Sequence, residues 1–124
     1  LQQIAAFEDQ LQGAGILLCK VYLQISAGEQ LKRLRKRLLT PQKHWKLSAA
    51  DLQAHRQFPQ YQAEWAATLA RSHRPSAPWY VLPADHKWLR NLLLASLLAR
   101  QFEALDLHWP TPPLPFSLAE LEQN

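Results

Sequence analysis

The chain has 124 residues, of which 48% are hydrophobic, enough for one domain with a packed core and for no more. Its 14 Lys and Arg exceed its 10 Asp and Glu, which gives a formal net charge of +4 and favours polyanionic partners. No apolar run is long enough to cross a bilayer, and the single cysteine, Cys19, excludes an intramolecular disulfide framework. The composition therefore indicates a soluble protein of the reducing cytoplasm.

The first two predicted elements are a helix and a strand. Apolar residues at helical spacing predict a helix over residues 1–12, which Gly13 and Gly15 end. The near-continuous apolar run over about residues 15–25 predicts a strand covered on both faces, as in a parallel sheet. Because the chain starts inside a helical pattern and contains no Met, we expect it to be part of a longer protein.

The next segment, residues 30–50, contains no acid and seven basic residues: Lys32, Arg33, Arg35, Lys36, Arg37, Lys43 and Lys46. Ser26 and Glu29 form a capping-box pattern, which predicts a helix that runs to about Leu39 and ends before Pro41. A loop then follows to Leu47. A cationic helix that leads into a loop is suited to closing over a polyanion.

Two more helices are predicted after this loop. Ser48 and Asp51 form a second capping-box pattern, and the helices extend over about residues 49–56 and 59–72. Residues 79–83 predict a short buried strand. Two strands separated by helices should be parallel, and two alone form only part of a sheet.

The last part of the chain predicts a helix and a tail. Asp85 is placed to cap a Leu-rich helix that runs to about Leu105. Residues 110–124 contain four prolines and should be extended, with one helical turn after Ser117.

Four groups of residues, in this order along the chain, together match one known family. They are Phe7-Glu8 with Leu11 and Gly15; Lys20, Leu23, Ile25-Ser26, Glu29-Gln30, Arg33 and Arg37; Pro41, Lys43, Trp45-Lys46, Ser48 and Asp51; and the run from Ala77 to Asp85 with Lys87-Trp88 and Arg90. The chain thereby resembles the polyphosphate kinase 2 family, phosphotransferases of the P-loop kinase type, from about Phe7 to Pro110.

The resemblance implies an incomplete three-layer α/β/α fold of the P-loop kinase type, mostly helical, with two parallel strands (about 15–25 and 79–83). Residues 1–109 would be the C-terminal part of the kinase domain, with a helical lid over about 30–72, and residues 110–124 a Pro-rich tail. It also implies phosphoryl transfer between inorganic polyphosphate and a nucleoside mono- or diphosphate, with Mg²⁺, in a protein that forms a homo-oligomer.

The family's glycine-rich phosphate loop is absent from this sequence. The three glycines are Gly13, Gly15 and Gly28, and none belongs to a pattern that ends in Gly-Lys. The aspartate at a strand end that helps to organise the metal in the family is absent as well. We therefore expect the chain to be inactive alone and the Mg²⁺ ligands to lie outside it.

The resemblance places the catalytic residues in the lid. Arg33 and Arg37 lie four residues apart and share a helix face, so they are the expected ligands of the transferring phosphoryl group. Lys43 and Lys46 should bind phosphate from the loop. Asp85 and Lys87 follow the last strand, where ligands of open α/β sheets bind, and are possible nucleotide-site residues.

Simpler interpretations compete with several of these roles. A solvated helix face accounts for Lys32, Arg35 and Lys36, lid packing accounts for Trp45, and a helix cap accounts for Asp85. The five histidines and Cys19 lack metal-ligand spacing, so no metal site is expected.

The alternative function is a basic helical module that binds nucleic acid through residues 30–50. That alternative explains the charge alone, whereas the kinase also explains the capping boxes and the strand over residues 79–83. A membrane-surface helix is excluded because the apolar face of this segment is too small.

Overall fold

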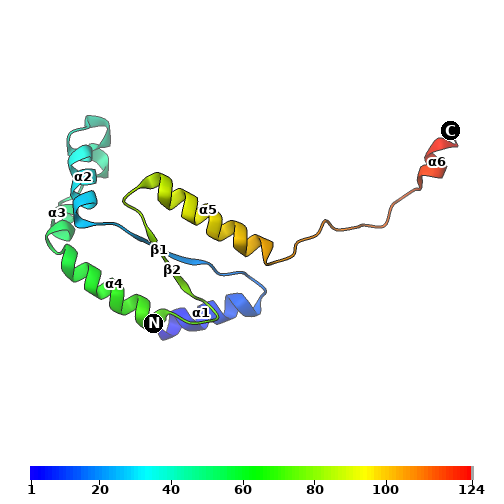
Figure 1. Ribbon diagram of the computed structural model, residues 1–124, viewed down its shortest axis with the longest axis horizontal. Coiled ribbons are helices and arrows are strands. Elements are labelled where there is room, and N and C mark those ends of the chain that lie inside the picture. Colours follow the sequence, from blue (N-terminus) through cyan, green and yellow to red (C-terminus); the bar gives the residue numbers. More distant parts are fainter. Residues whose placement is uncertain (124) are drawn as a thin grey trace. The chain divides into compact units, whose positions relative to one another are not determined.

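The computed structural model describes residues 1–123 and divides into two compact units, one of residues 1–94 and one from residue 95 onward. The first unit contains, in order, α1 (Gln2–Gly13), β1 (Lys20–Gln24), α2 (Ala27–Leu38), the 3-10 helix η1 (Pro41–Lys46), α3 (Ala49–Arg56), α4 (Phe58–Ser72) and β2 (Trp79–Pro83) (Figure 1). Helix α5 (Lys87–Glu103) starts in the first unit and ends in the second, which also contains α6 (Leu118–Glu122).

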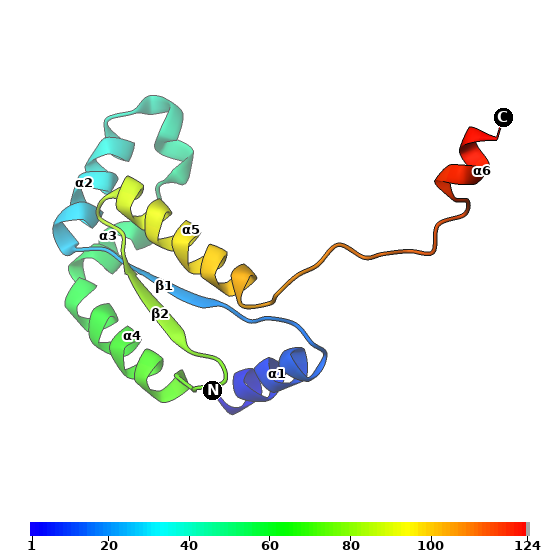
Figure 2. The ribbon, with the colours of Figure 1, turned by 45° about the vertical axis from the view of Figure 1, so that its right-hand side comes forward.

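The two strands are parallel, as predicted, and pair in register from Lys20 with Trp79 to Gln24 with Pro83 (Figure 2). The second strand has the predicted bounds. The first is shorter than the predicted run over residues 15–25, because a strand needs a hydrogen-bonding partner and β2 begins only at Trp79. Apolar pattern alone does not show where the partner strand starts.

One face of the sheet is covered by α1 and α4. Alternate residues of β1 point to this face: the Tyr22 and Trp65 ring centroids lie 5.1 Å apart, and Gln24 Nε2 donates to Gln62 Oε1 at 2.5 Å. The predicted cover of both faces is incomplete in the described part of the chain, because Leu23 and Val81 remain 43% and 53% exposed.

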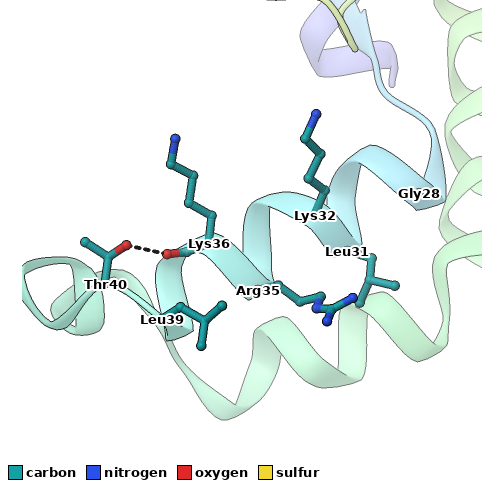
Figure 3. Close-up of a pocket in the computed structure, with 7 residues that line it drawn as sticks. All are labelled: Gly28, Leu31, Lys32, Arg35, Lys36, Leu39 and Thr40. Carbon is teal, nitrogen blue, oxygen red and sulfur yellow. Dashed lines mark hydrogen bonds between the residues drawn. The ribbon is translucent and has the colours of Figure 1, made fainter.

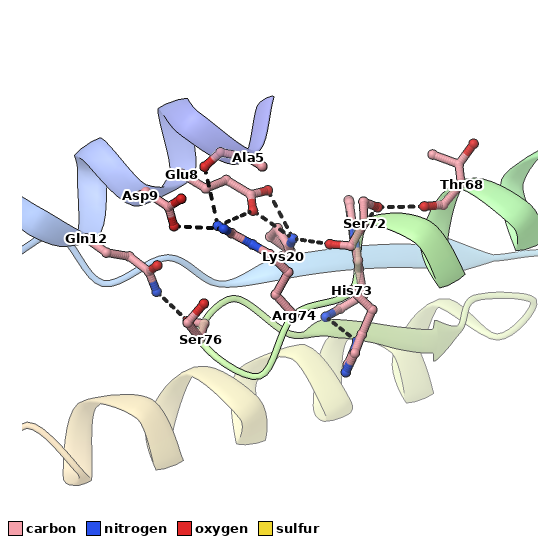
Figure 4. A network of polar contacts seen from close by, with 11 residues as sticks. Ala5, Glu8, Asp9, Gln12, Lys20, Thr68, Ser72, His73, Arg74 and Ser76 are labelled. Atoms are coloured by element: carbon pink, nitrogen blue, oxygen red, sulfur yellow. Dashed lines mark hydrogen bonds and ion pairs between the residues drawn. The ribbon is translucent and has the colours of Figure 1, made fainter. Parts of the chain in front are cut away.

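A network of ion pairs and hydrogen bonds joins α1, β1 and α4 at the amino ends of the strands (Figure 4). Lys20 Nζ lies 3.0 and 3.1 Å from the two carboxylate oxygens of Glu8 and donates to the carbonyl of Ser72 at 3.0 Å. Arg74, in the connector before β2, contacts Glu8 at 3.1 Å and Asp9 at 2.8 Å. The Lys20 and Glu8 side chains are only 6% and 9% exposed, so this pair is buried.

Most of the remaining predicted elements are confirmed. Helices α3 and α4 match the predicted ranges, and the capping box of α3 forms, with Ser48 N donating to Asp51 Oδ2 at 2.8 Å. The predicted loop after Pro41 is instead the 3-10 helix η1. The tail carries its predicted helical turn as α6, whose N-cap residue Ser117 forms a capping box with Glu120.

No helix in the described region is both long and apolar enough to span a bilayer.

Candidate functional site

A cavity of about 450 Å³ lies beside the carboxyl ends of both strands. Its lining residues come from α2, from the turn before α5 and from the first two residues of α5: Glu29, Lys32, Arg33, Lys36, Asp85, His86, Lys87 and Trp88. Both walls start where a strand ends, because β1 leads into α2 and β2 leads into α5 (Figure 2). This edge of a parallel sheet is where ligands of open α/β folds bind.

The start of α2 forms only half of its predicted capping box. Ser26 Oγ accepts from Glu29 N at 3.1 Å, as expected. The Ser26 N–H, however, donates to Asp85 Oδ1 at 2.8 Å, and Glu29 instead accepts from Arg33 Nε at 2.8 Å. The second half of the capping box was therefore assigned to the wrong carboxylate.

Asp85 was also assigned to the wrong helix. Helix α5 begins at Lys87, and the carbonyl of His86 accepts from Arg90 N at 3.0 Å, so His86 occupies the N-cap position. Asp85 caps α2 because the strand register continues past Gln24 and Pro83, with Ala84 N donating to Gln24 O at 2.7 Å. Two residues beyond the paired Gln24 and Pro83, Ser26 and Asp85 therefore lie opposite each other.

Arg33 bridges α2 and the end of β2. Its Nε donates to Glu29 and its Nη2 donates to the carbonyl of Ala84 at 2.7 Å. These contacts use two of the five N–H donors of a guanidinium group, which leaves three for other acceptors. The side chain is 28% exposed, so Arg33 is held in place and still accessible from the cavity.

Both carboxylates of the cavity are stabilised in their charged form. The hydrogen bond from Arg33, assisted by the charges of Lys32 and Arg33, lowers the pKa of Glu29. The backbone N–H of Ser26 lowers the pKa of Asp85, and His86 and Arg33 add to the effect. At neutral pH two carboxylates therefore face four Lys and Arg side chains, and the cavity carries an excess of positive charge.

Three exposed lysines carry most of the positive charge of the cavity: Lys32 and Lys36 on α2, and Lys87 at the start of α5. Figure 3 shows Lys32 and Lys36 projecting from the same side of α2, with Arg35 on the other side; the two lysines also line an adjoining cavity of about 470 Å³. Sequence reasoning assigned Lys32 and Lys36 to a solvated face. Their spacing of four residues was the available signal, since such pairs share a helix face.

The structure brings together three of the six predicted site residues. Arg33, Asp85 and Lys87 line the same cavity, whereas Arg37, on α2, and Lys43 and Lys46, on η1, are not among its lining residues. The functional roles of all six stay predictions.

Trp45 does not pack in the way that was expected. Its side chain is 79% exposed, and Lys46 Nζ lies 4.7 Å from its ring centroid. The predicted lid packing of Trp45 is therefore wrong.

The described residues do not fit a Mg²⁺ site. This metal prefers carboxylate and phosphate oxygens, but Glu29 and Asp85 share the cavity with four Lys and Arg side chains, whose positive charges disfavour a cation there. Residues 1–123 contain no cluster of three or more His, Cys, Asp or Glu side chains that could hold a metal.

Comparison with known proteins gives consistent matches. A sequence model of the family described as Polyphosphate kinase 2 matches residues 1–108. An AMP/ADP-polyphosphate phosphotransferase of Meiothermus ruber is 37% identical over 90% of this chain and 42% of its own length. A GDP-polyphosphate phosphotransferase of Mycobacterium tuberculosis is 32% identical over 93% of this chain and 39% of its own length.

The crystal structure of polyphosphate kinase 2 from Arthrobacter aurescens TC1 superimposes with a TM-score of 0.86 at 34% identity, over 98% of this chain and 43% of that one. The fold is therefore that of the corresponding part of a P-loop kinase-like α/β protein. The chain spans less than half of the length of each of these three relatives.

Proposed function

The chain belongs to the polyphosphate kinase 2 family, and from this premise we propose that it is the C-terminal, phosphate-binding part of a kinase. The kinase transfers phosphoryl groups between inorganic polyphosphate and a nucleoside mono- or diphosphate. The observation that carries the proposal is the cavity at the carboxyl ends of β1 and β2, where four Lys and Arg side chains outnumber two carboxylates.

The chemistry of phosphoryl transfer suits this arrangement. The protein has little covalent work to do, because it mainly positions the phosphates and neutralises the charge that spreads over the transferring group. Arg33 offers three free N–H donors in a planar fork that matches phosphate oxygens. Lys32, Lys36 and Lys87 supply mobile point charges around it, suited to the repeated charges of a polyphosphate chain.

The proposal keeps residues 30–72 as the lid, within a kinase part of residues 1–109 that precedes the Pro-rich tail over 110–124. Arg37, Lys43 and Lys46 would then contact phosphates that extend beyond the cavity. Trp88, which is 67% exposed on the cavity wall, offers an apolar surface beside Lys87 and Asp85 for the nucleotide.

Two further properties belong to the proposal. We place the protein in the cytoplasm, in keeping with the single free thiol of Cys19, whose pKa is raised by burial. We also propose that the complete kinase is a homo-oligomer whose Mg²⁺ is held by residues outside this chain.

A binding experiment tests the proposal against nucleic-acid binding, which the exposed Trp45 beside Lys46 would favour through base stacking. The chain should bind tripolyphosphate and long-chain polyphosphate more tightly than single-stranded or duplex DNA, with affinities that fall as salt is raised. Isothermal titration at about 50 mM and about 200 mM salt, a range over which phosphate contacts weaken strongly, measures both. Tighter binding of DNA, whatever its sequence, would favour the alternative.

The cavity itself is tested by a double substitution, Lys32→Gln with Lys36→Gln. Loss of two cationic contacts should weaken tripolyphosphate binding by about tenfold. Arg56→Gln with Arg71→Gln is the matched control, because both are exposed cations, in the last turns of α3 and α4, and neither is part of the cavity lining. An equal loss in the control would show that overall charge, rather than the cavity, attracts phosphate.

The purified chain should show no kinase turnover, because its sequence lacks the glycine-rich phosphate loop of the family. Transfer of phosphate from polyphosphate to ADP or GDP can be followed by luciferase or coupled assays. Turnover that persists after repeated purification would contradict this expectation.

A further inference from the structure

Two hydrogen bonds tie the start of α2 to the residues just after β2, and a third, within α2, holds Arg33 in place. Asp85 Oδ1 accepts from Ser26 N at 2.8 Å, Arg33 Nη2 donates to Ala84 O at 2.7 Å, and Arg33 Nε donates to Glu29 Oε1 at 2.8 Å. Two of these bonds join residues more than fifty positions apart in the chain. We call Ser26, Glu29, Arg33, Ala84 and Asp85 the α2 clamp.

The α2 clamp lies at the turn from β1 into α2, which sets the direction of the helix. Ser26 is the N-cap of α2, so its backbone is the point at which the chain turns from β1 into the helix. Arg33 lies nearly two turns further on and fixes a second point of the same helix to the strand end. Two points of attachment along one helix restrict its tilt as well as its position.

We propose that Asp85 is a positioning residue: through Ser26, and together with Arg33, it sets the direction of α2 so that Lys32 and Lys36 face the cavity. In this proposal Asp85 orients α2 and does not contact the nucleotide. The part that concerns Lys32 and Lys36 rests on the proposed function, whereas the clamp itself does not.

The charge of Asp85 contributes to the clamp. The charged groups around it are Arg33 and Glu29 from α2 and His86 from the turn before α5. The hydrogen bond from Ser26 N stabilises the carboxylate and lowers its pKa, and Arg33 and His86 act in the same direction. Because the folded-state pKa lies below the unfolded value, this contribution is complete above about pH 3.9 and is lost as the pH falls through the folded pKa.

Amide hydrogen exchange of the 124-residue chain measures the clamp directly. Asp85→Ala should increase the exchange rate of the Ser26 amide at least about tenfold, because that N–H loses its acceptor. Asp85→Asn keeps an acceptor oxygen without the charge and should give an intermediate rate. A Ser26 rate in Asp85→Ala within twofold of wild type would overturn the clamp.

The tail provides a matched control. Glu120 Oε2 accepts from Ser117 N at 2.7 Å, the same type of bond between a carboxylate and an N-cap amide, in the second unit. Glu120→Ala should accelerate exchange at Ser117 and leave Ser26 unchanged. Faster exchange at Ser26 in this variant would overturn the assignment of Asp85 as its acceptor.

A measurement on the wild-type chain replaces the variant if Asp85→Ala does not fold, as judged by far-UV circular dichroism. The amide chemical shift of Ser26 should follow a titration with a midpoint below the ordinary Asp pKa of about 3.9. A shift that stays constant as the Asp85 carboxylate titrates would overturn the clamp.

The positioning role has its own readout. Asp85→Ala should weaken tripolyphosphate binding severalfold, and Asp85→Asn should recover part of that affinity while the far-UV spectrum stays unchanged. Exchange at Ser26 that rises without any loss of tripolyphosphate affinity would overturn the positioning role. If the wild-type chain does not bind tripolyphosphate, the proposed function is refuted and so is the positioning role, whereas the Ser26 exchange rates still decide the clamp.

Discussion

Replacement of Lys20 by alanine should destabilise the fold by about 3 kcal/mol, the largest effect that we expect from any single substitution in this chain. Lys20 Nζ contacts both oxygens of Glu8 and the carbonyl of Ser72, and it lies 5.0 Å from the ring centroid of Trp79. Breaking a buried ion pair costs about 3–5 kcal/mol because one charge stays buried without its partner. We expect the lower end, because Arg74 still contacts Glu8.

Urea unfolding followed by circular dichroism measures this loss, with the unfolding slope checked for two-state behaviour. Lys32→Ala is the matched control: its ammonium group lies 3.7 Å from Glu29 but is 80% exposed, so no resolvable change is expected. If Lys20→Ala lowers the free energy of unfolding by less than about 1 kcal/mol, which is the effect of an average substitution, the Lys20–Glu8 pair does not stabilise the fold as expected.

A double-mutant cycle with Glu8→Ala isolates the pair. The combined variant should lose less stability than the sum of the single variants, because removing both charges leaves neither one buried alone. Additive losses would assign the effect of Lys20 to its contacts with Ser72 and Trp79 instead of Glu8.

The second large effect is expected on turnover. In a longer protein that carries this sequence together with a phosphate loop, Arg33→Ala should lower kcat by about 10²-fold or more. Arg33 has three N–H donors left after its contacts with Glu29 and Ala84, and it lines the cavity. Under the proposed function, its fixed charge would stabilise the transferring phosphoryl group.

Arg33→Lys is the informative comparison, because it keeps the charge and removes the planar fork. In steady-state kinetics, Arg33→Ala should lower kcat more than it changes KM. Arg33→Lys should recover part of the lost kcat. Arg37→Ala is expected to lower kcat to a similar degree, although Arg37 does not line the cavity. Wild-type rates for both alanine variants would remove the assignment of the two arginines to catalysis.

Elements with local signals were predictable from sequence. Helices α3 and α4 and strand β2 have the predicted ranges, because capping side chains and apolar spacing act over a few residues. The order of strand, helices and strand also predicted the parallel pairing, since a crossover of this length joins parallel strands.

Predictions that required a distant partner were less successful. Strand β1 is shorter than its apolar run because its length depends on where β2 begins. Lys32 and Lys36 are exposed, as predicted, but a run of basic residues on a helix does not reveal which side meets another element, so their place in the lining of the cavity was not predicted. Trp45 was expected to pack and is exposed, for the same reason.

By itself, the amino-acid sequence determined the family of this protein, the order of its elements and the segment that carries the positive charge. The tertiary structure alone decided which of those charges share a cavity and which carboxylate caps α2. Asp85 shows the physical reason: its acceptor oxygen could serve any nearby N–H, and only the register of two parallel strands brings Ser26 within 2.8 Å of it.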